Sequence, residues 1–318
     1  KKGEPVYLKD LKIEGVITSL LKDAIKPNIV QTLENNPAII HGGPFANIAH
    51  GCNSILATKT ALKFADYVIT EAGFGADLGA EKFLNIKCRK AGLKPKAAVV
   101  VATVKALKLH GDIEEKDLKE ENLEALAKGV QNLEKHIENL RKFNLPIVVA
   151  LNVFVTDTEK ELAFLENWAK EQGVEFSRTE VWEKGGLGGV DLAEKVVKAV
   201  EENDKELQLL YKDEASITEK IETVCREIYG ADGVNFSDEV KAEIERIERL
   251  GFKHLPVCMA KTPASLTDNA KIKGRPTGFN ITINDVKLRS GAGFVVAYAN
   301  KVLTMPGLPK VPSALNID

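Results

Sequence analysis

Short apolar runs alternate with longer stretches of helical periodicity from residue 38 to about residue 202. The runs at 38–40, 65–70, 97–104, 146–154 and 174–182 are expected to form strands. The clearest helical pattern between them is an apolar stripe with spacings of three and four, made of Leu123, Leu126, Val130, Leu133, Ile137 and Leu140. Strands that alternate with helices of this length predict parallel βαβ units with right-handed crossovers.

The pattern changes after about residue 202. Charged helical segments at 216–229 and 237–250 lead to an apolar run at 255–260 and a polar loop at 261–278. Two strand-like runs follow, at 279–286 and 293–299. We therefore expect an α/β fold with a parallel sheet, followed by a separate α+β unit.

Composition narrows the class of protein. The 318 residues are 44% hydrophobic and 28% charged, as in ordinary globular proteins, and the formal charge of −2 gives no reason to expect a nucleic-acid partner. No apolar run reaches the roughly 18 residues of a membrane span, and residues 1–6 lack the apolar core of a signal peptide. Cys52, Cys88, Cys225 and Cys258 form no CxxC pair, so we expect reduced thiols in a cytoplasmic protein.

Polar, glycine and aromatic residues are concentrated directly after the expected strands. In an open parallel sheet these positions share the edge where ligands bind. The candidates are His41 with Gly42-Gly43-Pro44; Glu71, Phe74 and Asp77; Lys105, Lys108 and His110; Asn152, Phe154 and Asp157; and Trp182 with Gly185-Gly186-Leu187-Gly188-Gly189.

Two glycine clusters each allow two interpretations. The segment 73–79 has the spacing G-x-G-x-x-x-G, one residue longer than a dinucleotide fingerprint. It therefore favours a turn that needs positive φ or close backbone approach, with a nicotinamide oxidoreductase as the weaker alternative. Gly185, Gly186, Gly188 and Gly189 precede a helical pattern at 190–200, where their N–H groups would bind a nucleotide phosphate or serve only as a flexible connection.

The histidines and the two late aromatics also have competing interpretations. His41, His50 and His110 have no partner at zinc-ligand spacing, so no metal site is expected, and hydrogen bonding to the backbone is favoured over catalysis. His136 lies on a charged helix, where we expect it to be solvated. Phe154 and Trp182 fit either core packing or stacking on a flat ligand at the sheet edge.

Six long words, or sequence segments, occur in one order along the whole chain: HGGPFANIAHGCNS at 41–54, TEAGFGADLGAEKF at 70–83, VATVKALKLHGD at 101–112, EVWEKGG at 180–186, LPVCMAKT at 255–262 and TMPGLPK at 304–310. They resemble hallmark segments of formate–tetrahydrofolate ligase. The third word departs from the family pattern, because Lys105 replaces an Arg and Asp112 a Gly. Arg and Lys bind anions differently, so no anion-binding role is carried over to Lys105.

The resemblance implies ligation of formate to tetrahydrofolate with MgATP through formyl phosphate, in a cytoplasmic homotetramer supported by a monovalent cation such as potassium. It also implies an incomplete nucleotide-hydrolase-like α/β domain at 1–134, a second α/β unit at 135–224 and a C-terminal α+β domain at 225–318. By position, Phe154 and Trp182 resemble the pair that encloses the pterin ring, and Phe74 lines the same pocket.

The family's phosphate-binding loop, G-x-x-x-x-G-K-[ST], does not occur in the 318 residues. We expect it upstream, and we expect this chain alone to bind folate without catalysing ligation. The alternative is a non-catalytic folate-binding subunit or scaffold, completed by a separate nucleotide-binding chain.

Overall fold

The structure, a computed structural model, describes residues 5–43, 49–73 and 75–299. Its α-helices in this part are α1 (Leu8–Leu11), α2 (Glu14–Leu21), α3 (Ile55–Ala61), α4 (Arg89–Ala91), α5 (Val104–His110), α6 (Leu123–Arg141), α7 (Glu159–Glu171), α8 (Val181–Lys184), α9 (Val190–Glu202), α10 (Ile217–Val224) and α11 (Asp238–Ile247). Its strands are β1 (Asn28–Gln31), β2 (Pro37–Ile40), β3 (Ala98–Ala102), β4 (Ile147–Asn152), β5 (Glu175–Thr179), β6 (Gly233–Phe236), β7 (Val257–Ala260), β8 (Asn280–Arg289) and β9 (Phe294–Ala299).

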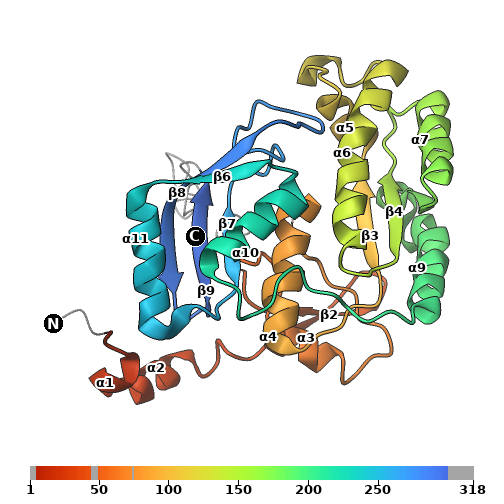
Figure 1. Ribbon diagram of the computed structural model, residues 1–318. Coiled ribbons are helices and arrows are strands. Elements are labelled where there is room, and N and C mark those ends of the chain that lie inside the picture. Colours follow the sequence, from red (N-terminus) through yellow and green to blue (C-terminus); the bar gives the residue numbers. More distant parts are fainter. Residues whose placement is uncertain (1–4, 44–48, 74, 300–318) are drawn as a thin grey trace, which may run out of the picture.

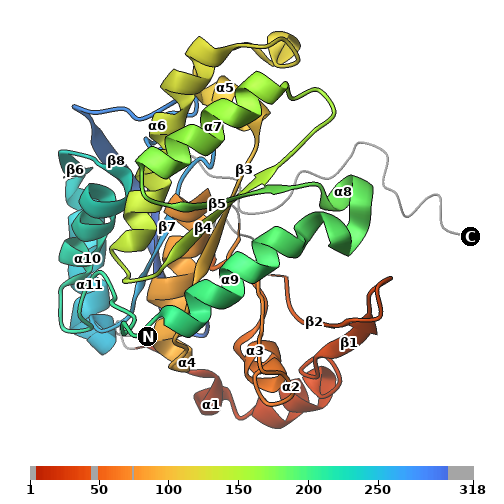
Figure 2. The ribbon, with the colours of Figure 1, turned by 90° about the vertical axis from the view of Figure 1, so that its right-hand side faces the viewer.

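A parallel three-stranded sheet in the order β3-β4-β5 forms the first core, as the alternating pattern predicts. The helix α6 contacts β3 and β4, α7 contacts β5, and α9 contacts both β4 and β5 (Figures 1 and 2). The expected stripe of α6 is buried apart from its first residue, Leu123, which is 38% exposed. β4 is buried along nearly its whole length, because the sheet is covered on both faces there.

A mixed four-stranded sheet in the order β6-β8-β9-β7 forms the second layer. The pairs β6–β8 and β7–β9 are parallel, and β8–β9 is antiparallel. This arrangement agrees with the α+β unit expected after residue 202. β7 and β9 are buried throughout, so this sheet also lies within the core.

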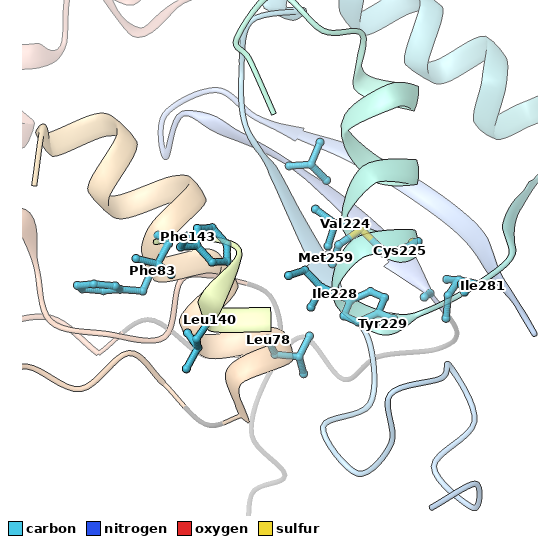
Figure 3. Packing of buried hydrophobic residues seen from close by; sticks show 14 of the residues in the cluster. Leu78, Phe83, Leu140, Phe143, Val224, Cys225, Ile228, Tyr229, Met259 and Ile281 are labelled. Carbon is cyan, nitrogen blue, oxygen red and sulfur yellow. The ribbon is translucent and has the colours of Figure 1, made fainter. Parts of the chain in front are cut away.

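Helix α6 lies between the two sheets and joins them through its polar face. Asn132, Lys135 and Asn139 are nearly buried, and their side chains donate to the carbonyl oxygens of Gly274, Glu227 and Ile228 at 2.9, 3.0 and 2.8 Å. Apolar packing continues across this boundary, from Leu78, Phe83, Leu140 and Phe143 to Val224, Tyr229, Met259 and Ile281 (Figure 3).

Helices α5 and α6 approach closely because two glycines have no side chain. A Cβ added at Gly129 would lie 1.8 Å from the carbonyl oxygen of Leu107, and one added at Gly111 would lie 2.0 Å from that of Ala125. Both neighbours are backbone atoms, so they cannot move aside as a flexible side chain would.

Two of the expected strands are not part of the parallel sheet. The run at 38–40 forms β2, but β2 pairs antiparallel with β1 in a hairpin. The run at 65–70 forms no strand, and Ile69 is 90% exposed. A strand needs a neighbour for its backbone hydrogen bonds, and the described residues provide none here. The expectation that the loops after Ile40 and Thr70 share the edge of the parallel sheet is therefore wrong.

The first part of the chain exposes much apolar surface. Helices α1 and α2 contain no buried residue, and Ile29, Val30, Leu20 and Leu33 are all exposed. The edge strand β3 pairs only with β4 among the described strands, and its Val99 and Val101 are 40% and 68% exposed. Both regions resemble the interior face of a larger assembly more than a solvent-facing surface.

Candidate functional site

The carboxyl ends of β3, β4 and β5 bring three groups of candidates to one edge of the sheet. Helix α5 with Lys105 follows β3, a turn with Phe154 and Asp157 follows β4, and α8 with Trp182 follows β5. Registers of parallel pairing place Ala102 beside Leu151 and Asn152 beside Thr179, so these segments leave neighbouring strands at the same level. Figure 2 shows α8 at the end of β5.

Phe154 is held in a tight turn directly after β4. Its N–H donates to Oδ2 of Asp157 at 2.8 Å, and its carbonyl accepts from the N–H of Asp157 at 2.9 Å. Burial raises the pKa of the Asp157 carboxyl, although the hydrogen bond from Phe154 opposes this shift. The Phe154 side chain remains 39% exposed, so part of the ring is open to a ligand.

Trp182 lies on the short helix α8 and not at the end of a strand, because β5 ends at Thr179. A hydrogen bond from the N–H of Glu180 to the carbonyl of Gly188, at 3.0 Å, closes the loop that carries it. The Trp182 side chain is 89% exposed. Core packing, one of its two interpretations, therefore does not apply to Trp182.

The glycine turn after α8 already contacts a carboxylate. Residues Gly185–Gly189 form a short 3-10 helix ahead of α9, and the N–H of Gly186 donates to Oε1 of Glu34 at 2.6 Å. A Cβ at Gly186 would lie 2.5 Å from the other Glu34 oxygen, so glycine permits this approach. A nucleotide phosphate bound at Gly185, Gly186, Gly188 and Gly189 would have to displace Glu34.

Lys108, another candidate near this edge, is held in a buried ion pair and is not open to a ligand. Its Nζ lies 2.9 Å from Oε1 of Glu161, and both side chains are buried. The same carboxylate oxygen accepts from the N–H of Asn122, and Lys108 also donates to the carbonyl of Glu120. The pair therefore fixes the loop between α5 and α6 to the start of α7.

Two of the candidate histidines are held by hydrogen bonds. His41 contacts Oγ of Ser54 at 2.7 Å and the carbonyl of Ala24 at 2.9 Å. Nδ1 of His110 accepts from the N–H of Gly274 at 3.1 Å, and burial lowers the pKa of His110 to about 4. These hydrogen bonds favour a structural role for His41 and His110 over a catalytic one.

The expectation that His136 is solvated is wrong. Its helix, α6, lies between the two sheets, and burial lowers the pKa of His136. It adjoins an ion pair in which Nζ of Lys261 lies 2.9 Å from Oδ2 of Asp77. Burial opposes ionisation of Asp77, but Lys261 and then His136 outweigh that effect and lower its pKa.

The Asp77–Lys261 pair joins two of the long words across the sheets, and sequence reasoning did not predict it. Lys261 follows a fully apolar strand, β7, and Asp77 lies in the first turn of a π-helix, Gly75–Ala80, that follows the glycine-rich turn. A charged residue directly beside a buried segment needs an oppositely charged partner, and this is the signal in the sequence that could have indicated the pair. The glycines of this turn behave as their conformational interpretation requires: Gly73 and Gly75 have positive φ, and a Cβ at Gly79 would lie 2.4 Å from the Gly73 carbonyl.

The whole chain is similar to one described protein family. A model of the family described as formate–tetrahydrofolate ligase matches residues 1–318. The chain belongs to the formate–tetrahydrofolate ligase family. Members of this family join formate to tetrahydrofolate with a new C–N bond and use ATP, so the match confirms the resemblance of the six long words.

One substrate of the ligase family is chemically suited to the aromatic residues at the sheet edge. Tetrahydrofolate carries a flat pterin ring, and Trp182 and Phe154 present exposed aromatic surface at the edge of the parallel sheet. Phe74, the third residue expected at the folate pocket, lies outside the described residues. Among the residues described, no group of three or more His, Cys, Asp or Glu side chains is arranged to bind a metal ion.

The cysteines and the helices of this ligase-family chain can also be described. The four cysteines are free and buried, and burial raises the pKa of Cys52 to about 11 and that of Cys88 to about 12. In the part of the chain that the structure describes, no helix has both the length and the apolar character needed to cross a bilayer.

Proposed function

We propose that this chain provides the folate-binding part of a formate–tetrahydrofolate ligase, with the pterin ring stacked between Phe154 and Trp182. The exposure of Trp182 is the observation that carries the proposal. An indole that is 89% exposed contributes little to the core, yet it stands at the ligand-binding edge of a parallel sheet. Aromatic faces hold a planar heterocycle while its polar edge remains free for hydrogen bonds.

The polar edge of the pterin has acceptors nearby. Asn152 ends β4, and the carboxylate of Asp157 is fixed beside Phe154 by its bond to the backbone. The pterin carries N–H groups on its pyrimidine edge, which a carboxylate or an amide oxygen can accept. In the proposed complex these two side chains orient the ring that the aromatics hold.

The proposed reaction has two steps. A formate oxygen attacks the γ-phosphorus of MgATP, which gives formyl phosphate and ADP. The N10 amine of tetrahydrofolate then attacks the formyl carbon, expels phosphate and loses a proton, which gives 10-formyltetrahydrofolate. Magnesium enters with ATP, and a monovalent cation such as potassium supports the intact enzyme, a cytoplasmic homotetramer.

The ATP phosphates need a partner beyond the residues described above. The 318 residues contain no G-x-x-x-x-G-K-[ST] loop, whose amides and lysine would hold these phosphates. We propose that a segment outside the 318 residues supplies the loop and adds a strand to β3. The support for this docking is the open edge of β3 and its exposed Val99 and Val101.

Folate binding by the purified chain tests the proposed site. Trp182→Ala should weaken tetrahydrofolate binding roughly tenfold to a hundredfold, because stacking is worth about 0.5–1.5 kcal/mol and the contact area adds about 25 cal/mol per Å². Calorimetric titration measures the affinity, and the melting temperature should change little because Trp182 is exposed.

The second tryptophan provides a matched control. Trp168 packs against the core from α7, so Trp168→Ala should lower the melting temperature and leave folate affinity nearly unchanged. Phe154→Ala should behave like the Trp182 variant. Unchanged affinity in well-folded Phe154 and Trp182 variants would remove both residues from the site.

Ligation assays test whether this chain binds folate while another segment supplies the phosphate loop. The chain alone should form no 10-formyltetrahydrofolate from ATP, formate and tetrahydrofolate, and addition of a segment that carries the phosphate loop should restore the reaction. Turnover by the chain alone at the rate of a complete ligase would contradict this prediction. If the alternative of a non-catalytic subunit applies, folate should bind while a separate nucleotide-binding chain is needed for any turnover.

A further inference from the structure

The ring of Phe154 has a cation on one side. Nζ of Lys105 lies 4.5 Å from the centre of the ring, within the range of a cation–π contact. Lys105 reaches this position from the first turn of α5, which Thr103 caps by accepting the N–H of Ala106 at 3.0 Å. The two residues follow the neighbouring strands β3 and β4, so the contact spans the edge of the sheet.

The Lys105 ammonium is not committed to an ion pair. No carboxylate among the described residues lies within 4.0 Å of it, whereas Lys108, one turn further along α5, is buried against Glu161. Asp157 is close enough for the positive charge of Lys105 to favour its ionised form, although burial is the larger influence on its pKa. The main contact of the ammonium is therefore the aromatic face.

The turn that carries Phe154 is held by two hydrogen bonds, and its ring lies against the ammonium of Lys105. The two bonds with Asp157 fix the turn from both directions. Nζ of Lys105 lies over the ring, so one face is directed at the ammonium, and the exposed remainder is what a ligand can reach.

We propose that Lys105 is a positioning residue and a specificity determinant for the folate, acting through Phe154. This inference rests on the proposed stacking of the pterin on Phe154. The ammonium occupies one face of the Phe154 ring, so the pterin stacks on the opposite face. Every copy of the protein therefore offers the pterin the same face of the ring. A ring that could tilt or change rotamer would hold the pterin in several orientations and present its amine to the formyl group less often.

The cation also affects which pterin is preferred. It attracts the π electrons of Phe154 toward its own side, which makes the opposite face a better partner for an electron-rich ring. A tetrahydropterin, whose reduced ring nitrogens donate electrons, is richer than an oxidised pterin. Lys105 therefore favours tetrahydrofolate over folic acid.

Substitution of Lys105 gives a direct test. Lys105→Met, which keeps the length but removes the charge, should weaken tetrahydrofolate binding about two- to fivefold and folic acid binding less. Lys105→Arg should retain the preference, because a guanidinium also binds an aromatic face. Lys9→Met removes a similar contact, 5.4 Å from the ring of Tyr7 on α1, and should change neither affinity.

An NMR measurement separates this inference from the proposed function. The ring current of Phe154 should shift the ε-methylene protons of Lys105 upfield, and Phe154→Leu should abolish that shift. If the unaltered chain binds no folate, the proposed site and this role both fail, whatever the shift shows. If it binds folate and Lys105→Met leaves the ratio of the two affinities unchanged, or the shift is absent, only the role of Lys105 is refuted.

Discussion

At the scale of single residues, Glu81 holds a carboxyl group in the interior. Its Oε1 accepts from Nδ2 of Asn85 at 2.8 Å, whereas its buried Oε2 has no hydrogen-bond partner among the described residues. Burial raises the pKa of Glu81 to about 7 from its ordinary value of 4.5. Between these two values the folded state keeps a proton that the unfolded state releases. Its contribution to stability is therefore complete below pH 4.5 and is lost as the pH rises through about 7.

Glu81→Gln should remove this pH dependence, because the amide cannot ionise and can still accept from Asn85. The variant should melt like the unaltered chain at pH 4.5 and at a higher temperature at pH 8, with a gain on the order of 3 kcal/mol in unfolding free energy. Thermal unfolding across this pH range is the measurement. An equal difference between the two proteins at every pH would contradict the assignment.

A position directly after a strand indicates candidate residues from the sequence, but the sequence does not show which of them are buried. Phe154 follows β4 and was predicted in that place, because the run before it is almost entirely apolar. Trp182 was expected at a strand end but lies on α8, since polar residues in β5 gave no sign of where pairing stops. The charged residues around His136 suggest solvent, although one of them, Lys135, is buried and donates to the carbonyl of Glu227 in the second unit.

At the scale of elements, the crossing of α5 and α6 depends on the absence of side chains. Gly129→Ala should improve the intrinsic helix propensity of α6 by about 1 kcal/mol. The new methyl group, however, would meet the backbone of Leu107 at 1.8 Å and force the helices apart. We expect net destabilisation of about 1–3 kcal/mol, visible as a lower melting temperature.

Gly15→Ala is the matched control, because Gly15 lies within α2 and no atom lies within 4 Å of its added Cβ. That variant should be neutral or slightly more stable. If Gly129→Ala behaved in the same way, the close helix crossing would not be needed for stability.

The elements that the sequence predicted well are those whose partners lie nearby in the chain. β4 pairs with β3 and β5, and α6 covers β3 and β4, so periodicity and pairing agree. The run at 65–70 has strand-like composition, but composition does not show whether a neighbouring strand exists. The division at residues 134 and 135 stays a prediction, although α6 runs continuously through it.

At the scale of the whole molecule, β3 has no neighbour on one side among the described strands, and Val99 and Val101 expose apolar side chains on one face beside that edge. Such edges pair with other chains unless something covers them. Val101→Lys should reduce self-association, measured by light scattering, without lowering the melting temperature, because Val101 is 68% exposed. It should also impair restoration of ligation by the segment that carries the phosphate loop.

Val197→Lys on α9 serves as the comparison, since a partly exposed valine on a helix offers no open backbone edge. Val197→Lys should change neither self-association nor the restoration of ligation. Undiminished association of the Val101 variant would show that β3 is not the surface through which the chains pair.

The position of α6 between the two sheets affects the timing of synthesis. The carbonyl that Asn132 binds belongs to Gly274, 142 residues later in the chain. At about 5–20 residues per second, a ribosome needs roughly 7–30 s to reach it. Lys135 and Asn139 find their partners Glu227 and Ile228 earlier, but the Asn132 end of the polar face has no native partner until Gly274 is made. A chaperone that shields this face during translation would raise the yield of folded chain more than one that acts on the finished polypeptide.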